Sequence, residues 1–293
     1  MVCVALALMA HPTGANAQLR VDDALAYLDR GDSDRAVQIL QPLASRGDVL
    51  AQYNLGVLAL AGQGGIGTDQ ADHWLDKAAQ AGYLPAKIAL ADLSLDRHDW
   101  VQAEHWYERA AQAGDVTAQF MSGLILDQGL AGEGDPDAAR HWYEQAAQQG
   151  HAQAQFALAT LLMEGGHPQQ AAHWFEQAAG QGHVAAKFEL ARALAAGHGV
   201  AQDAAAARGW YLRAAHAGFA PAMYNLALMQ ARGRGGRGSY RLALAWALNA
   251  QNAGHDPAQD LIAALRDVMP PDAQADAGAL AQTCIARQSE VCD

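Results

Sequence analysis

The sequence predicts an all-α protein, built as an α/α solenoid of stacked helix pairs. The first observation is a repeated Ala-x-x-Trp motif. Its tryptophans are 32 or 36 residues apart, at Trp74, Trp106, Trp142, Trp174, Trp210 and Trp246. The second observation is a glycine that closes each copy, eight residues after the tryptophan. The third is a composition of 51% hydrophobic and 17% charged residues, which is typical of a folded chain. Self-similarity at such a period indicates a repeat architecture.

Residues 1–17 predict a signal peptide. Met1–Ala10 is an apolar run, and residues 15–17 read Ala-Asn-Ala, an A-x-A cleavage motif in front of Gln18. The basic segment that usually precedes such a run is missing, and a short buried helix is the alternative. With a signal peptide, the protein is expected to be periplasmic or secreted in a bacterium.

Each Ala-x-x-Trp motif predicts a helix, which we call helix B. Alanine at i, tryptophan at i+3 and alanines at i+7 and i+8 lie on one helical face, and the closing glycine suits a left-handed C-cap. The residues four positions before the motif are mostly capping residues: Asp99, Asp135, His167, Asp203 and Ser239. Pro136 and Pro168 suit the first helical position.

A second helix, helix A, is predicted after each glycine. It begins near Ala51, Ala86, Ala118, Ala154, Ala186, Ala222 and Ala258. Two residues later, six copies have a bulky side chain, and we expect this column to interlock neighbouring repeats: Tyr53, Ile88, Phe120, Phe156, Phe188 and Tyr224. The difference between 32- and 36-residue repeats falls between helix A and helix B, so insertions are expected on one face.

These units resemble the SEL-one-like repeat (SLR) family, a branch of the tetratricopeptide superfamily. Its units read roughly A-x-x-x-L-G, then G-x-G-V-x-x-D, then A-x-x-W-Y-x-x-A-A-x-x-G. The resemblance covers residues 48–254 in six repeats: 48–82, 83–114, 115–150, 151–182, 183–218 and 219–254. Residues 18–47 resemble a degenerate N-terminal helix pair, and residues 255–293 resemble C-terminal capping helices. In one departure from the pattern, Ala247 follows Trp246 where an aromatic residue is usual.

The resemblance implies a superhelix in which helix A lines a concave surface, and a role as an adaptor or scaffold in bacterial envelopes. The expected partner is a protein or peptide. Candidate partner-binding residues are polar positions of helix A and one edge tryptophan: Gln52, Asn54, Lys87, Gln119, Gln155, Lys187, Asn225 and Trp100. For the polar positions, an ordinary solvated helix surface is the alternative. The sequence leaves the partner's identity and the oligomeric state open.

The cysteines agree with export. Cys3 would leave with the signal peptide, and Cys284 and Cys292 form an even pair that can close a disulfide in an oxidising compartment. Cysteine-rich members of the family carry the same Cys-x7-Cys spacing in each repeat, so the resemblance implies a Cys284–Cys292 disulfide. Eight residues of unbroken helix span about 12 Å, too far for a disulfide, so a turn is expected between the two. Two unpaired thiols are the alternative.

Composition and motifs argue against several other classes. The net charge of −12 disfavours nucleic acid as a partner. The sequence also contains no stretch of 18 or more apolar residues, the length needed to span a bilayer. The sequence has no G-x-S-x-G, H-E-x-x-H or Walker motif, so we expect neither an enzyme nor a cofactor. Equivalent histidines of stacked repeats lie about 10 Å apart, whereas one zinc ion needs its ligands at about 2.0 to 2.1 Å. No metal site is therefore expected from His73, His105, His141 and His173.

Three functions remain, of which an interaction scaffold is the most favoured. The others are a component of an envelope polysaccharide or cell-wall machine and a β-lactamase-like enzyme of the cysteine-rich type, for which Cys284–Cys292 is the only matching pair. The basic segment 232–241 reads Arg-Gly-Arg-Gly-Gly-Arg-Gly-Ser-Tyr-Arg. It is either a glycine-rich turn or a docking patch for an acidic partner.

Overall fold

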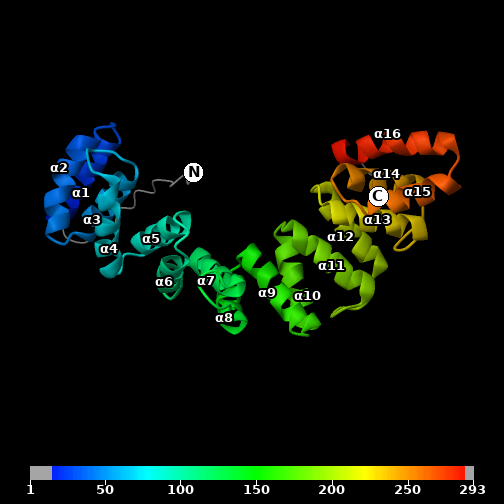
Figure 1. Cartoon of the computed structure of the whole chain (residues 1–293), viewed down its shortest axis with the longest axis horizontal. Coiled ribbons are helices and arrows are strands. Elements are labelled where there is room, and N and C mark those ends of the chain that lie inside the picture. Colours follow the sequence, from blue (N-terminus) through cyan, green and yellow to red (C-terminus); the bar gives the residue numbers. More distant parts are fainter. Residues whose placement is uncertain (1–14, 288–293) are drawn as a thin grey trace. The chain divides into compact units, whose positions relative to one another are not determined.

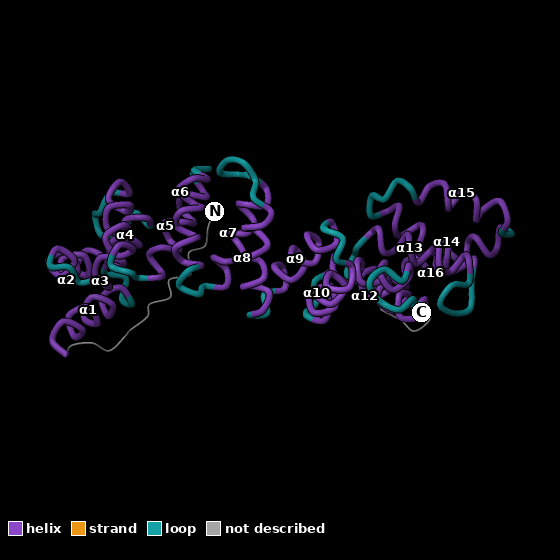
Figure 2. The backbone as a smooth tube through the Cα atoms, turned by 90° about the horizontal axis from the view of Figure 1, so that it is seen from below, coloured by secondary structure: helices purple, strands orange, loops and turns teal. Residues whose placement is uncertain are grey.

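The computed structural model describes residues 15–287, with side chains from 21 to 284, and this part of the chain contains helices and no strand (Figure 1, Figure 2). The predicted all-α solenoid of helix pairs is confirmed. The chain divides into two compact units, Met1–Ala139 and Arg140–Asp293, which we call the N-terminal and the C-terminal unit. The predicted signal peptide lies outside the described residues except for residues 15–17, the first of α1.

The helices follow one another with short connections. The N-terminal unit holds α1 (Ala15–Leu28), α2 (Ser33–Ser45), α3 (Val49–Leu60), a 3-10 turn (Thr68–Gln70), α4 (Ala71–Gln80), α5 (Leu84–Asp96), α6 (Trp100–Ala111) and α7 (Val116–Gln128). Helix α8 (Pro136–Gln148) spans the boundary between the units. The C-terminal unit continues with α9 (Ala152–Glu164), α10 (Pro168–Gly180), α11 (Val184–Ala196), α12 (Ala204–His216), α13 (Ala220–Arg232), α14 (Tyr240–Asn252), α15 (Ala258–Val268) and α16 (Pro271–Arg287).

The predicted helix pairs are present at their expected places. The odd-numbered helices from α3 to α13 are the A helices, and the even-numbered ones from α4 to α14 are the B helices. Each of these A helices begins two residues before the predicted alanine. The glycines that follow the B helices, from Gly82 to Gly254, have φ between 84° and 98°, and an added Cβ would meet nothing within 4 Å. Glycine is therefore needed for its left-handed conformation, as a helix C-terminus requires, rather than for lack of space.

The predicted N-caps of the B helices are confirmed with one exception. Asp99, Asp135 and Asp203 accept hydrogen bonds from backbone N–H groups in the first turn, and so does the Ser239 hydroxyl. His167 makes no such bond, and Pro168 starts its helix instead. These bonds satisfy N–H groups that a helix leaves without an internal partner.

The bulky column of the A helices interlocks neighbouring repeats, as predicted. The half-buried ring of Tyr53 packs edge-on against Tyr83, with 5.1 Å between centroids, and Phe156 stacks on His183 at 4.6 Å. Two further contacts follow the same rule: Phe188 with Phe219 and Tyr224 with His255. In each case the second ring directly follows the glycine that ends the repeat, so the aromatic contact holds the next A helix against the previous one.

Three of the four long A-to-B loops lean on the preceding B helix, or on α2 in the first repeat. The Cβ of any other residue at Gly64, Gly199 or Gly235 would collide with the main-chain oxygen of the first helical residue there, which is Ser33, Pro168 and Ala204 respectively. All three glycines also have positive φ. Conformation and close approach therefore both require glycine at these positions.

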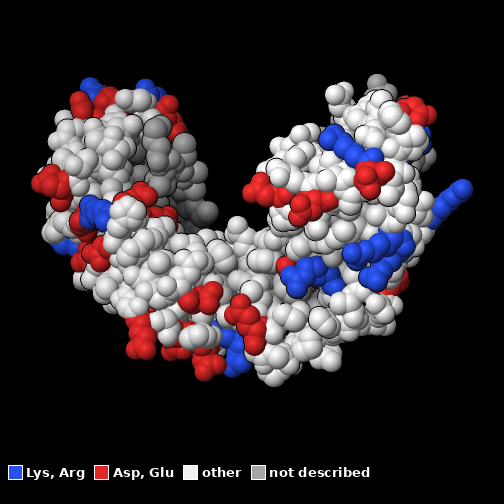
Figure 3. All heavy atoms as spheres, turned by 45° about the vertical axis from the view of Figure 1, so that its right-hand side comes forward, with Lys and Arg blue, Asp and Glu red and all other residues white. Residues whose placement is uncertain are grey.

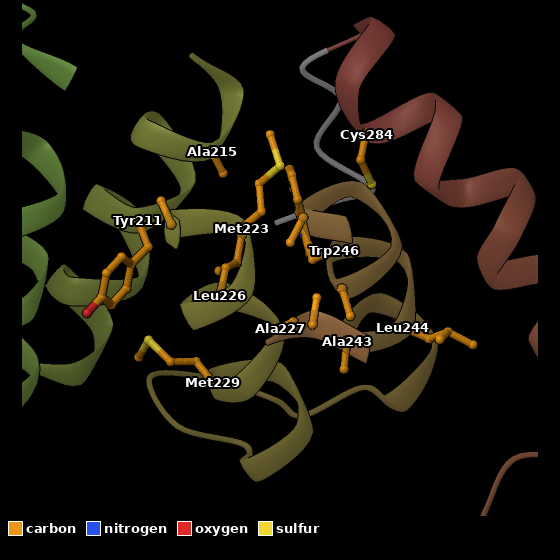
Figure 4. Packing of buried hydrophobic residues seen from close by; sticks show 14 of the residues in the cluster. Tyr211, Ala215, Met223, Leu226, Ala227, Met229, Ala243, Leu244, Trp246 and Cys284 are labelled. Atoms are coloured by element: carbon orange, nitrogen blue, oxygen red, sulfur yellow. The ribbon is translucent and has the colours of Figure 1, made fainter. Parts of the chain in front are cut away.

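A hydrophobic core joins α11 to α16 in the C-terminal unit. Trp246, Met223 and Leu226 lie at its centre, surrounded by alanines that allow the helices to approach closely (Figure 4). Helix α16 packs on α14, where Asn249 donates from Nδ2 to the main-chain oxygen of Ala281 at 3.0 Å. Cys284 points from α16 into this core and is fully buried. Cys292 lies outside the described residues, so the Cys284–Cys292 disulfide stays a prediction.

Candidate functional site

The three candidate glutamines are not surface residues, and this part of the prediction is wrong. Gln119 and Gln155 are buried, and their Nε2 atoms donate to the main-chain oxygens of Ala111 and Ala147 at 3.3 and 3.1 Å. Gln52 makes the equivalent bond to the last turn of α2 at 3.1 Å. Because the last carbonyls of a helix have no internal partner, each glutamine caps the helix before it. The sequence signal was the spacing: Gln119 and Gln155 follow, by eight residues, the second alanine of an Ala-Ala pair, and Gln52 follows Ala44 by the same distance.

The two candidate lysines occupy the same position in other repeats but remain accessible. Lys87 in α5 and Lys187 in α11 are half-buried, and their side chains make no hydrogen bond or ion pair with any described residue. Their ammonium groups therefore remain available to a partner. A lysine side chain is long enough to carry its charge past the neighbouring helix to water, whereas the shorter glutamine ends on the carbonyl.

The two candidate asparagines differ in the same way. Asn54 is buried and donates from Nδ2 to the main-chain oxygen of Leu50 in its own helix at 2.8 Å, and its binding role stays a prediction. Asn225 in α13 is half-buried, and its amide makes no hydrogen bond within the described range. Trp100 is half-buried at the first residue of α6, with its ring 5.9 Å from that of His98, and its binding role stays a prediction.

Two recesses open on the C-terminal unit. One, of about 450 Å³, lies between α11, α12 and α13 and is lined by Asn225 together with Tyr211, Leu228, Arg232 and Arg234. The other, of about 500 Å³, lies between α8 and α10 and is lined mainly by polar groups with Trp174 at one side. Sequence reasoning missed both, because each is formed by residues from more than one repeat.

A tyrosine of the B helix faces the exposed side of the A helix in both units. In the N-terminal unit, the Tyr107 hydroxyl donates to Asp92 Oδ1 at 2.6 Å. Burial raises the pKa of Asp92 and, together with that carboxylate, the pKa of Tyr107. In the C-terminal unit, burial raises the pKa of Tyr211 to about 12. Tyrosines with raised pKa values stay protonated at neutral pH, so both hydroxyls remain hydrogen-bond donors.

The histidine and tryptophan column of the B helices is exposed on its histidine side. His73, His105, His141 and His173 each meet the adjacent tryptophan edge-on, with 4.9 to 5.3 Å between ring centroids. Lys77, Arg109 and Arg213 lie over the tryptophan three residues before them. Between residues 21 and 284, no cluster of three or more His, Cys, Asp or Glu side chains could hold a metal ion. None of the described helices is long and apolar enough to cross a membrane.

Comparison with known proteins identifies the repeat. The family model of the Sel1 repeat matches six segments: residues 49–83, 97–115, 116–151, 152–183, 184–219 and 220–255. The second match is short and covers mainly α6, and the others each cover a whole helix pair.

Solved structures share the fold. A protective antigen of uropathogenic Escherichia coli strains, which displays an SLR fold, is 25% identical with a TM-score of 0.56, over 92% of this chain and 68% of that one. A Sel1 repeat protein from Oxalobacter formigenes is 22% identical with a TM-score of 0.53, over 92% and 98% of the two chains. An F-box protein from Arabidopsis thaliana is 35% identical over 71 residues. That match spans 24% of this chain and only 20% of the plant protein.

Proposed function

The chain belongs to the Sel1 repeat family, whose members typically mediate contacts between proteins, and on this basis we propose that it is a protein-binding scaffold. The proposed binding face is the exposed side of the A helices, which the family resemblance places on a concave surface. The partner is a protein or a peptide segment that lies along several repeats, as superhelical repeats commonly bind.

The observation that carries this proposal is the apolar character of the A helices on their exposed side. In α7, Phe120, Met121 and Leu124 are only half-buried, and in α9 the same holds for Phe156 and Leu161. Covering such side chains releases apolar surface from water, at about 25 cal/mol per Å². The B helices expose mainly charged, amide and histidine side chains, with single apolar residues such as Val101 in α6 and Tyr240 in α14.

Site-specific photocrosslinking tests the binding face. A photoreactive phenylalanine analogue is placed at Met121 or Leu161 on the A helices, and at the exposed Gln102 or Gln177 on the B helices as matched controls. We expect the same partner protein to be crosslinked from both A positions and from neither B position. Equal crosslinking from both sets, or none from the A positions, would overturn the proposal.

We also propose that the protein acts outside the cytoplasm of a bacterium. The apolar run of residues 1–10 and the Ala-Asn-Ala motif of residues 15–17 support this. Immunoblotting of periplasmic and cytosolic fractions checks it, and the intact 293-residue chain in the cytosol would contradict it.

The Sel1 repeat family is an interaction family and is not generally enzymatic. For this chain we propose the same, on the basis of its membership of that family. A nitrocefin assay tests the β-lactamase alternative, and hydrolysis above the rate of a heat-denatured sample would contradict our reading.

A further inference from the structure

We propose that the recess between α11, α12 and α13 binds an acidic segment of a partner protein, through Arg232, Arg234 and Asn225. This inference rests on the proposed scaffold function and names the chemistry of the partner. It concerns only the C-terminal unit, and the recess of about 450 Å³ is large enough for a few side chains.

Three polar side chains at the recess can donate hydrogen bonds and have no acceptor among the described residues. Arg232, Arg234 and Asn225 line it, and none of their side chains makes a hydrogen bond or an ion pair with a described residue. The nearby acidic group is already neutralised, because Glu189 pairs with Arg192 at 3.1 Å. Guanidinium groups carry only donors and match a carboxylate with two parallel bonds. The ligand that completes this site is therefore a carboxylate.

The backbone under the two arginines is fixed. Arg232 is the last residue of α13, and Gly233 follows in the left-handed conformation with φ of 64°. The main-chain N–H of Arg234 then donates to the oxygen of Met229 at 3.0 Å, and Gly235 packs directly on the main chain of Ala204. Such anchoring lowers the entropy that is lost when the site is occupied.

The remaining walls of the recess favour a peptide over a free anion. Leu228, Met229 and Ala195 supply an apolar surface, and Tyr211 adds a ring and a hydroxyl. Figure 4 shows Tyr211 and Met229 on the same side of the core, and both line the recess. A simple anion would leave this apolar surface exposed to water. A segment with apolar residues next to glutamate or aspartate would cover it.

Charge supports the same partner. The whole chain carries a net charge of −12, yet residues 232–241 contain four arginines and no acidic residue. Figure 3 shows basic side chains gathered in patches on the visible face of the C-terminal unit, in the right-hand half of the picture. A local basic patch attracts an acidic protein segment, whereas the net negative charge opposes the long polyanion of a nucleic acid.

Peptide selection against the full chain tests the inference. A displayed library of random twelve-residue peptides is selected on the wild type, and enriched peptides are titrated by fluorescence anisotropy. We expect enriched peptides with acidic residues beside apolar ones. The Arg232→Glu/Arg234→Glu variant should bind them at least about tenfold more weakly, a change of about 1.4 kcal/mol. The Arg237→Glu/Arg241→Glu variant has the same charge change at the end of the loop and the start of α14, and its binding should stay within about twofold of the wild type.

The controls separate the possible outcomes. Circular dichroism and the melting temperature establish that both double variants fold. Inorganic phosphate and vesicles of phosphatidylglycerol are titrated in parallel, and tighter binding of either than of the peptides would overturn the inference. So would peptides without acidic residues, equal losses in both variants, or no enrichment. If crosslinks from Met121 and Leu161 persist in those cases, the scaffold function stands and only the acidic specificity fails.

Discussion

The two units fill the same helix-capping position with different chemistry. In the N-terminal unit, Asp48 and Asp115 accept the backbone N–H three residues later at 2.9 and 2.8 Å. In the C-terminal unit, His151 and His183 accept the equivalent N–H through Nδ1, both at 3.2 Å. All four residues directly follow the glycine of the preceding repeat. These four repeats thus place an acceptor here with different acid–base chemistry, whereas Tyr83 and Phe219 occupy the same position without a cap bond and are followed by a proline in the first turn.

The histidine caps give the C-terminal unit a pH response. Burial lowers the pKa of His151 and His183 below 6.5, so the unfolded chain binds more protons than the folded one. Stability then rises with pH in this range. The stabilisation that the neutral histidines contribute is complete above their unfolded-state pKa of 6.5. It is lost as the pH falls toward their lowered pKa in the folded chain. A protonated Nδ1 can no longer accept, so the cap itself is lost.

The exposed side of the A helices differs between the units in the same manner. Asp92 in α5 and Arg192 in α11 occupy equivalent positions, each close to the tyrosine of the following B helix, Tyr107 or Tyr211. Small buried residues and glycines set the helix frame in both units, whereas the polar positions vary. Two repeats with one backbone can therefore present opposite charges to a partner.

The largest expected effect tests whether equivalent positions are energetically equal. Trp246→Ala should destabilise the C-terminal unit by about 3 to 5 kcal/mol, because that side chain is fully buried. Trp74→Ala, at the same repeat position in the N-terminal unit, should cost clearly less because Trp74 is half-buried. Urea unfolding followed by circular dichroism measures both. Equal losses would show that exposure at this position does not set the energy.

The next effect separates buried glutamines from accessible lysines. Gln155→Ala should cost about 1 kcal/mol, because the carbonyl of Ala147 keeps only the Gly150 N–H as a donor and the side-chain amide of Gln181 loses its acceptor. Lys187→Ala, at the equivalent position, should change the free energy of unfolding by less than about 0.5 kcal/mol. Thermal and urea unfolding of the two variants provide the comparison. A loss for Lys187→Ala as large as that for Gln155→Ala would refute the distinction.

Tyr107 and Tyr211 occupy equivalent positions in the two units, and their replacement by phenylalanine should have different effects on stability. Tyr107→Phe should cost about 1 kcal/mol at neutral pH, since it removes a hydrogen bond to a carboxylate that is only partly exposed to water. The cost should shrink in acid, because the raised pKa of Asp92 lets the carboxyl become neutral as the pH falls through it. Tyr211→Phe should have a smaller effect at either pH. Urea titrations at pH 7 and pH 4 test this, and a cost that does not depend on pH would contradict it.

The smallest expected effect concerns the caps themselves. When the pH falls from 7 to 5, the wild-type C-terminal unit should lose less than about 1 kcal/mol of stability, since an N-cap typically contributes about that much. The His183→Asp variant should not show this loss. Asp115→His should introduce such a loss in the N-terminal unit. Hydrogen exchange of the A helices at the two pH values reports on each unit separately. Unchanged pH dependence in both variants would show that the histidine caps are neutral in stability.

Sequence reasoning predicted the helix pairs well because they depend on local patterns. The Ala-x-x-Trp register, the glycine C-caps and most N-caps can be read from a few adjacent residues, and all are found in the structure. The binding residues were predicted less well. Gln155 and Lys187 share one position in the repeat, and only the neighbouring helix shows that one side chain ends on a carbonyl. The recess around Asn225 joins three helices and has no local signature.

The glycines that lean on the preceding helix have a consequence for how such chains grow. A repeat with a long loop cannot be moved freely along the chain. Gly199 and Gly235 pack against the first carbonyl of the preceding B helix, so they fit only where that carbonyl is accessible. In the long loop after α7, the position that corresponds to Gly199 and Gly235 is Ala131, and the preceding helix α6 begins with Trp100. Gene duplication or recombination at these borders must therefore respect the order of the repeats. A chimera that exchanges single repeats will join cleanly only where the incoming loop and the outgoing helix were already neighbours.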